Sequence, residues 1–213
     1  MRSRSVKSPT ASRRAFERYE KNKPAAQMIG IENKADSNNP VWRPASAIDL
    51  DIIEQIARAV HPDLPERREV FAEKLSLFPD GCLALARREE VMGYGLAHCW
   101  AFGSVPPLDA FLEKAPDRAD CLYIHDVALL PEARGIGSGG HYVRLMVECA
   151  RKIGVDFLAL VSVYNNQPFW AKRGFEVVSA PELSAKLRGY GPTARYMTRK
   201  LTLSRSPITP GSS

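Results

Sequence analysis

CLYIHDVALLPEARGIGSGG, residues 121–140, is the stretch of sequence that decides the fold of this chain. Its first nine residues, Cys121–Leu129, are mostly aliphatic or aromatic and contain no turn former, which predicts a strand. Pro131 ends this strand, and a glycine-rich loop follows over residues 134–140. Beyond the loop, apolar side chains recur at helical spacing and predict a helix: Tyr142, Leu145, Met146, Cys149 and Ile153.

The succession of strand, glycine loop and helix predicts an anion-binding site. Glycines allow a tight turn that exposes backbone N–H groups, and a helix start adds unpaired donors and a partial positive charge. A phosphate or pyrophosphate group is therefore the expected ligand of the loop.

Two well-known phosphate-binding classes fit the loop poorly. Gly135-x-Gly137-x-x-Gly140 satisfies the dinucleotide pattern, but five residues separate it from the end of the strand at Leu129. The next predicted strand, residues 156–163, also ends without the carboxylate that such sites use for the ribose. A P-loop is excluded because no Gly-Lys-Ser/Thr follows.

Three motifs in order resemble the Gcn5-related N-acetyltransferases (GNAT family). Arg134-x-x-Gly137-x-Gly139, after a strand with Pro-Glu at its end, resembles the acyl-CoA loop of that family. WRPA at residues 42–45, before an Asp-rich helix start, resembles its opening strand and first helix. FWAKRGF at residues 169–175 resembles its closing segment, and the whole resemblance covers residues 41–203.

The resemblance implies an α/β (α+β) fold with a mixed, mostly antiparallel sheet of about six to seven strands and about four flanking helices. Strands are expected over residues 41–45, 82–86, 91–100, 121–129, 156–163, 175–178 and 194–203. Ile48, Ile52, Ile56 and Val60 predict the apolar stripe of a first helix, and a second helix is expected over residues 66–77. Residues 102–119 and 181–192 are expected to form loops, the first of them either a substrate lid or a plain connection.

Charge and composition favour one soluble domain with a basic extension. The 213 residues are 45% hydrophobic, and most of the net charge of +6 lies in residues 1–40. The domain itself is near neutral, which argues against a nucleic-acid partner, and no apolar run is long enough to span a membrane. We expect a disordered extension over 1–40, the domain over 41–203 and a flexible tail over 204–213.

The four cysteines, Cys82, Cys99, Cys121 and Cys149, show neither a C-x-x-C pair nor a metal-binding spacing. With no secretory segment, they predict buried reduced thiols in a cytoplasmic protein that uses no metal. The Arg- and Ser-rich residues 1–16 leave mitochondrial targeting as an alternative to a floppy extension or a start codon placed too early. The sequence does not decide between monomer and homodimer.

The resemblance implies that backbone groups bind acetyl-CoA. The amides of Val127 and Leu129 would pair with the pantetheine arm, the loop N–H groups would bind the pyrophosphate, and the Leu129 amide would also donate to the oxyanion. Arg134 would assist with its charge or lie in solvent. The other expected contacts are Ala128, Gly135, Ile136, Gly137, Ser138, Gly139, Asn166 and Trp170.

His125 is the expected general base, because regular strand alternation puts it on the same face as Val127. A histidine occupies this position in some relatives, such as the aralkylamine acetyltransferases; the alternative is a core histidine hydrogen-bonded to its neighbours. Asp126 is the second choice, as an anchor for the acceptor ammonium or the partner of an arginine. His61, in the turn after the first helix, either lines the acceptor site or faces solvent.

Trp170 stands where many family members have a tyrosine that protonates the leaving thiolate, so Tyr164 or a water would have to replace it. The sequence thus predicts an N-acetyltransferase that moves an acetyl group from acetyl-CoA to a primary amine, of a small molecule or a protein, by direct attack in a ternary complex. A CoA-binding regulatory or interaction module with weak or no turnover is the alternative.

Overall fold

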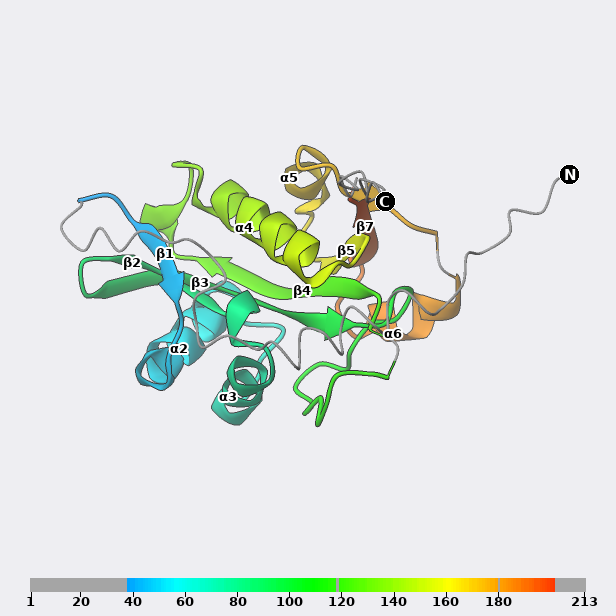
Figure 1. The fold of residues 1–213 in the computed structure, drawn as a ribbon, viewed down its shortest axis with the longest axis horizontal. Coiled ribbons are helices and arrows are strands. Elements are labelled where there is room, and N and C mark those ends of the chain that lie inside the picture. Colours follow the sequence, from blue (N-terminus) through cyan, green and yellow to red (C-terminus); the bar gives the residue numbers. More distant parts are fainter. Residues whose placement is uncertain (1–37, 118, 180, 202–213) are drawn as a thin grey trace, which may run out of the picture.

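A computed structural model describes residues 38–117, 119–179 and 181–201, which form a seven-stranded sheet with helices on both faces (Figure 1). The strands are β1 Val41–Pro44, β2 Leu83–Arg87, β3 Glu90–Trp100, β4 Cys121–Leu129, β5 Phe157–Ser162, β6 Glu176–Val177 and β7 Arg195–Lys200. Their order is β1-β2-β3-β4-β5-β7-β6, and every pair is antiparallel except β4 with β5. The predicted α/β class with a mostly antiparallel sheet is confirmed.

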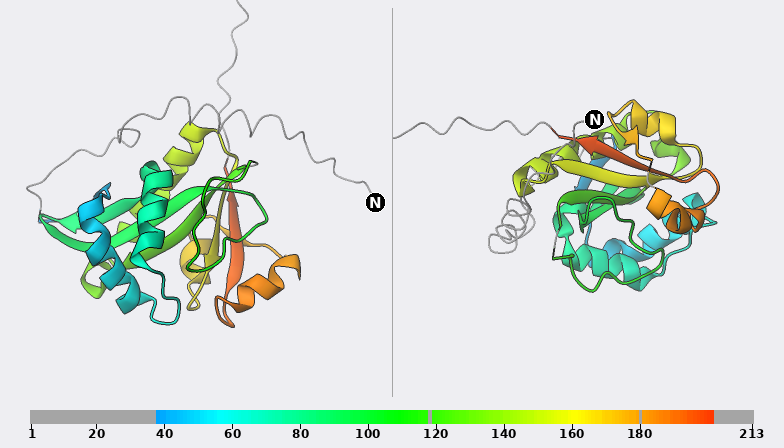
Figure 2. Two further views of the ribbon diagram at one scale, coloured as in Figure 1. Left: turned by 90° about the horizontal axis from the view of Figure 1, so that it is seen from below. Right: turned by 90° about the vertical axis from the view of Figure 1, so that its right-hand side faces the viewer.

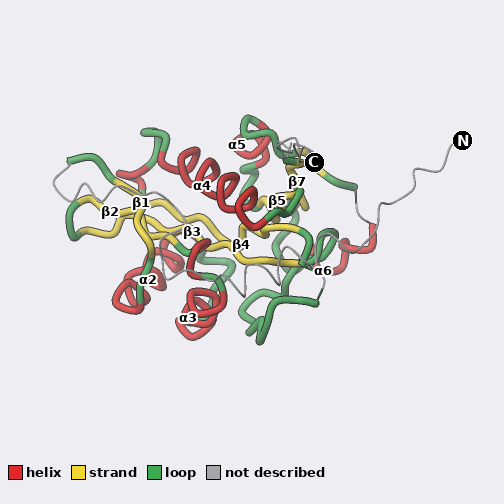
Figure 3. Tube along the Cα trace, in the orientation of Figure 1, coloured by secondary structure: helices red, strands yellow, loops and turns green. Residues whose placement is uncertain are grey.

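Helices cover both faces of this sheet. The α-helices are α2 Leu50–Val60, α3 Arg68–Leu77, α4 Ser138–Ile153, α5 Gln167–Ala171 and α6 Ser184–Arg188, and short 3₁₀ turns are η1 Ala47–Asp49, η2 Pro79–Gly81, η3 Pro131–Ala133 and η4 Pro181–Leu183. α4 and α5 lie on one face, and α2 and α3 lie on the other (Figures 1 and 3). The irregular segment between β3 and β4 runs beside α6, on the same side as α3 (Figure 2).

Close packing of α4 on the sheet fixes the start of this helix. Trp42 of β1 donates its indole N–H to the backbone oxygen of Ser138 at 2.9 Å, in a buried position. A Cβ added to Gly95 would lie 2.3 Å from the ring of Tyr142, so only glycine allows the helix to approach β3 this closely. A glycine inside a strand often marks such a close approach of the backbone.

The sheet opens between β4 and β5. The two strands pair only at Leu122 with Leu158 and Tyr123 with Ala159, near the start of each strand. Further along β4, the backbone N–H of Leu130 donates to Met92 on the β3 side. Because backbone groups alternate in direction along a strand, the N–H groups of the odd-numbered residues 127 and 129 point away from β3, into the opening.

A β-bulge in β4 changes which way its side chains point. Leu96 pairs with Asp126, but the next residue, Ala97, pairs with Ile124, so His125 is the extra residue of the bulge. An extra residue of this kind reverses the alternation of side chains beyond it.

The bulge therefore overturns one prediction made from regular alternation. Ile124 and Val127 both pack in the core on the α4 side, whereas His125 and Asp126 contact residues of the α2–α3 side. The sequence had predicted that His125 and Val127 share a face, and this prediction was wrong.

Two further predictions were wrong in detail. Ile48 is 88% exposed, because residues 47–49 form a 3₁₀ turn and the buried face of α2 consists of Leu50, Ile53, Ile56 and Ala57. Residues 181–192, expected as a loop, contain η4 and α6. The predicted extension and tail fall almost wholly on residues 1–37 and 202–213, outside the described residues.

The prediction for the cysteines agrees with the structure. All four cysteines are buried and free, and burial raises the pKa of the Cys82 thiol to about 12. In the described ranges, no helix is both long and apolar enough to cross a membrane.

Candidate functional site

A groove of about 650 Å³ runs along the open edge of β4 to the first turn of α4. Val127 and Leu129 form its β4 side, where their N–H groups are unpaired with β5. The other walls come from the glycine loop, the end of α2 and the segment around α5: Val60, His61, Ala133, Arg134, Gly135, Gly137, Ser138, Gly139, Gly140, Tyr164, Asn166, Phe169, Trp170 and Arg173.

The glycine loop has the conformation that an anion site requires. Gly135 and Gly137 have φ values of 77° and 91°, in the left-handed region that glycine adopts without strain. Gly137 is the N-cap of α4, so the first N–H groups of this helix lie at the groove. Arg134 is exposed and donates from Nε to the backbone oxygen of Leu129 at 2.9 Å, which ties the loop to β4.

Two residues expected at this site lie elsewhere. Ala128 is fully buried in the core beneath α2, and its side chain lines neither the groove nor the cavity described next. Ile136 is exposed at the tip of the loop and does not line the groove.

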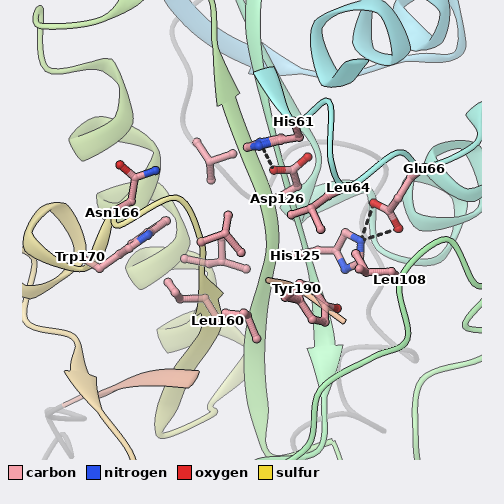
Figure 4. A pocket seen from close by; sticks show the side chains of 14 residues that line it. His61, Leu64, Glu66, Leu108, His125, Asp126, Leu160, Asn166, Trp170 and Tyr190 are labelled. Atoms are coloured by element: carbon pink, nitrogen blue, oxygen red, sulfur yellow. Dashed lines mark hydrogen bonds and ion pairs between the residues drawn. The ribbon is translucent and has the colours of Figure 1, made fainter. Parts of the chain in front are cut away.

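A smaller cavity of about 80 Å³ lies where β4 and β5 diverge (Figure 4). Its apolar lining comes from Leu64, Leu108, Ile124, Leu160, Val161, Val163 and Tyr190, and its acidic and histidine lining from His61, Glu66, His125 and Asp126. Four residues line both this cavity and the groove, namely His61, Val127, Asn166 and Trp170. The two spaces therefore meet beside β4, just past its split from β5.

His125 is held by a buried acidic residue. Its Nε2 lies 3.1 Å and 2.9 Å from the two carboxylate oxygens of Glu66, and the side chains are 3% and 6% exposed. Lys74, with a fully buried side chain, places Nζ 3.7 Å from the same carboxylate. Burial alone raises the pKa of Glu66, but the charge and hydrogen bond of His125, helped by Lys74, bring it down to about 2. Glu66 is therefore ionised at neutral pH.

Asp126 is held from two sides. The Tyr94 hydroxyl donates to one carboxylate oxygen, and His61 Nε2 lies 2.9 Å from the other. The His61 ring stacks on Tyr164, with centroids 5.6 Å apart and planes 6° from parallel. Burial lowers the pKa of His61, but the nearby Asp126 carboxylate outweighs this and raises it above its usual value. Of the two positions weighed from the sequence, His61 thus lines the site.

The remaining predicted residues lie around the junction. Asn166 is the N-cap of α5, and the Trp170 indole packs edge-on against Phe169 and Phe175. Tyr164 has a φ of 51°, and burial raises the pKa of its hydroxyl, so this hydroxyl keeps its proton at neutral pH.

Sequence reasoning missed Glu66, Lys74 and Tyr94, which hold the two candidate catalytic residues of β4. Glu66 and His125 are 59 positions apart, so no local spacing links them. Only Lys74 offered a usable signal in the sequence. It lies at helical spacing from the core residues Val70 and Phe71, and a lysine on the buried face of a helix indicates a buried acidic partner. Across the described residues, no group of three or more His, Cys, Asp and Glu side chains could hold a metal ion.

Comparison with solved structures gives folds of the same kind at low sequence identity. The loading GNATL domain of CurA from Lyngbya majuscula has a TM-score of 0.63 and 14% identity, covering 76% of this chain and 98% of that one. Naa50 from Arabidopsis thaliana, in complex with the bisubstrate analogue CoA-Ac-MVNAL, has a TM-score of 0.57 and 13% identity, covering 76% and 99%. N-acetylglutamate synthase from Neisseria gonorrhoeae, complexed with coenzyme A and N-acetyl-glutamate, has a TM-score of 0.56 and 22% identity, covering 78% and 36%.

Comparison with family models is more decisive, although the sequence matches no curated protein. The model of the acetyltransferase (GNAT) family matches residues 50–175, from the start of α2 to the residue before β6. This match spans more than half of the chain. It contains β4, the glycine loop and the four residues that line both the groove and the cavity. The chain belongs to the acetyltransferase (GNAT) family.

Proposed function

We propose that this protein transfers the acetyl group of acetyl-CoA to a primary amine by direct attack in a ternary complex. The observation that carries the proposal is the meeting of two spaces beside the unpaired edge of β4. The groove suits a long carrier with a phosphate at one end, and the cavity suits a second, smaller substrate. Acetyl transfer requires that both reactants meet at one point. The groove and the cavity meet at the residues that line both, namely His61, Val127, Asn166 and Trp170.

Acetyl-CoA would bind mainly through backbone groups. The unpaired N–H groups of Val127 and Leu129 offer hydrogen bonds to the pantetheine amides, as an added strand would. The N–H groups at Gly135, Gly137, Ser138 and Gly139 offer a site for the pyrophosphate. Complexes of two structurally similar proteins with CoA or a CoA-containing analogue support this choice of carrier.

In the reaction, the lone pair of the amine attacks the thioester carbonyl, and the C–N bond forms as the oxyanion develops. The Leu129 N–H would donate to this oxyanion. The C–S bond then breaks and CoA leaves as a thiolate, which needs little help from an acid.

Asp126 would hold the acceptor ammonium, and the neutral form of His61 would take its proton. The Asp126 side chain lines the cavity and is 17% exposed, and its contact with His61 Nε2 lies at the junction. His125 stays a predicted base, although its Nε2 is occupied by Glu66.

Two measurements test the proposal. Saturating CoA or acetyl-CoA should raise the melting temperature by about 5–10 °C, since ligand at 100 times its Kd adds about 2.7 kcal/mol. Free-thiol release from acetyl-CoA should then appear with at least one member of a panel of amines. A shift with NADH but not with CoA contradicts the proposal, and CoA binding without thiol release for any amine favours a CoA-binding module instead.

A further inference from the structure

We propose that the acceptor is a small primary amine with a short apolar body and no carboxylate, enclosed under the segment that joins β3 to β4. This inference rests on the proposed acetyl transfer and names the substrate class of the same site.

The size of the cavity limits the body of the acceptor. Its volume is about 80 Å³, whereas an apolar cavity of about 150 Å³ accommodates benzene. At the same volume per atom, the cavity holds roughly three to five non-hydrogen atoms in addition to the carbon that carries the amino group. An aromatic ring is too large for it.

The lining of the cavity favours an apolar body. Leu160, Val161 and Val163 contribute side chains from β5 and its end, and Leu64 and Leu108 contribute side chains from two different loops. Burying an alkyl group here removes apolar surface from water on both sides of the contact. The acidic and histidine side chains gather instead near β4, at Asp126 and its neighbours, and the Asn166 amide lies across the cavity (Figure 4).

Hydrogen bonds from the C-terminal part of the domain fasten the covering segment. The Tyr190 hydroxyl, next to the cavity, donates to the backbone oxygen of Pro106 at 2.8 Å. Lys186 of α6 donates to the backbone oxygen of Val105 at 3.1 Å. Leu108, two residues beyond Pro106, is thereby held as a wall of the cavity.

Hydrogen bonds around α3 fasten the other side of the same segment. Arg67 donates from Nε to the Asp109 carboxylate at 2.8 Å, and the Asp109 N–H donates to Glu66 at 3.2 Å. Glu73 accepts from the N–H groups of Leu112 and Glu113 at 2.7 Å each. The segment is therefore tied at both flanks, which leaves little room for a polypeptide acceptor on this side of the cavity.

The charges around the cavity disfavour a carboxylate on the acceptor. Glu66 and Asp126 line it, and neither lysine nor arginine is among its lining residues in the described part of the chain. An α-amino acid would place its carboxylate close to these two acidic groups, and the two histidines of the lining, His61 and His125, already contact those groups. An amine of the same shape without the carboxylate avoids this repulsion.

The test compares acceptors of matched shape by thiol release from acetyl-CoA with the full-length protein. Isobutylamine and valine share a branched body but differ in the carboxylate, phenethylamine adds an aromatic ring, and a tripeptide with a free N-terminus represents polypeptides. Leu108→Ala enlarges the cavity. Leu112→Ala is the matched control, since it alters the same segment at a residue outside the lining.

We expect kcat/KM to be at least ~100-fold higher for isobutylamine than for valine or the tripeptide. Phenethylamine should react poorly with the unaltered protein and ~10-fold better with Leu108→Ala, but not with Leu112→Ala. Equal rates with valine or the tripeptide overturn this inference and leave acetyl transfer standing. Absence of thiol release with every acceptor, despite CoA binding, overturns the proposed function and this inference together.

Discussion

Glu66→Gln should destabilise the fold strongly, because the buried Glu66 carboxylate contacts both His125 Nε2 and Lys74 Nζ. The pKa of Glu66 is lowered from 4.5 to about 2 in the folded protein. A difference of about 2.5 units corresponds to about 3 kcal/mol of stability at pH 7. A typical domain has a total stability of about 5–15 kcal/mol, so this one group contributes a large share.

The pH dependence of this loss follows from the sign of the shift. A carboxyl group whose pKa is lowered by folding stabilises the fold above its unfolded pKa, and the contribution disappears as the pH falls through the folded value. For Glu66 the contribution is complete above about pH 5 and still about 2 kcal/mol at pH 3.5, from the same two pKa values. The difference in unfolding free energy between the unaltered protein and Glu66→Gln should therefore be smaller in acid than at pH 7.

Urea unfolding followed by tryptophan fluorescence measures this gap directly. Glu54→Gln is the control, because Glu54 pairs with Arg58 on the surface of α2 and an exposed pair of this kind contributes about 0.3–0.5 kcal/mol. The account predicts a loss of about 3 kcal/mol at pH 7 for Glu66→Gln. A loss below about 1 kcal/mol, or a gap that widens toward pH 3.5, would refute the reasoning.

Three other substitutions probe separate parts of the account. Gly137→Ala should weaken CoA binding at least ~10-fold in calorimetry, because a side chain at this left-handed residue enters the groove. Gly191→Ala is the control, since it carries similar backbone strain away from the groove and should leave CoA binding unchanged. Equal losses of CoA affinity in the two variants contradict the loop's role. Gly95→Ala should lower stability by about 1–3 kcal/mol in thermal unfolding, since the added methyl group meets the Tyr142 ring, and an unchanged melting temperature contradicts this packing. Asp126→Asn should lower kcat at least ~10-fold with CoA affinity unchanged within about twofold, and a parallel loss of both argues against its role at the acceptor.

Local features of the sequence predicted the strand, the glycine loop and the helix start of the proposed acyl-carrier site well. The structure has β4 with the predicted bounds, and α4 begins within the glycine loop at Ser138, because strand composition, Pro131 and the glycines act on neighbouring residues. Left-handed φ values at Gly135 and Gly137 are likewise a local consequence of glycine.

For the proposed acceptor site, the sequence offered single candidates such as Asp126 and His61, but their arrangement could not be predicted because it depends on contacts between distant segments. The β-bulge at His125 arises from the pairing of β4 with β3, and the residue types around His125 do not predict it. Asp126 meets His61, 65 positions earlier, and the cavity wall combines Leu108 with Tyr190. Such pairs follow from tertiary packing rather than from local propensity.

Backbone amide chemical shifts during titration with CoA test the central claim most directly, namely that the open edge of β4 and the glycine loop bind the carrier. The account predicts that the largest changes occur at the N–H groups of Val127, Leu129, Gly135, Gly137 and Gly139, with saturation at one equivalent. Saturable binding that leaves these five amides unchanged and shifts another surface would contradict it.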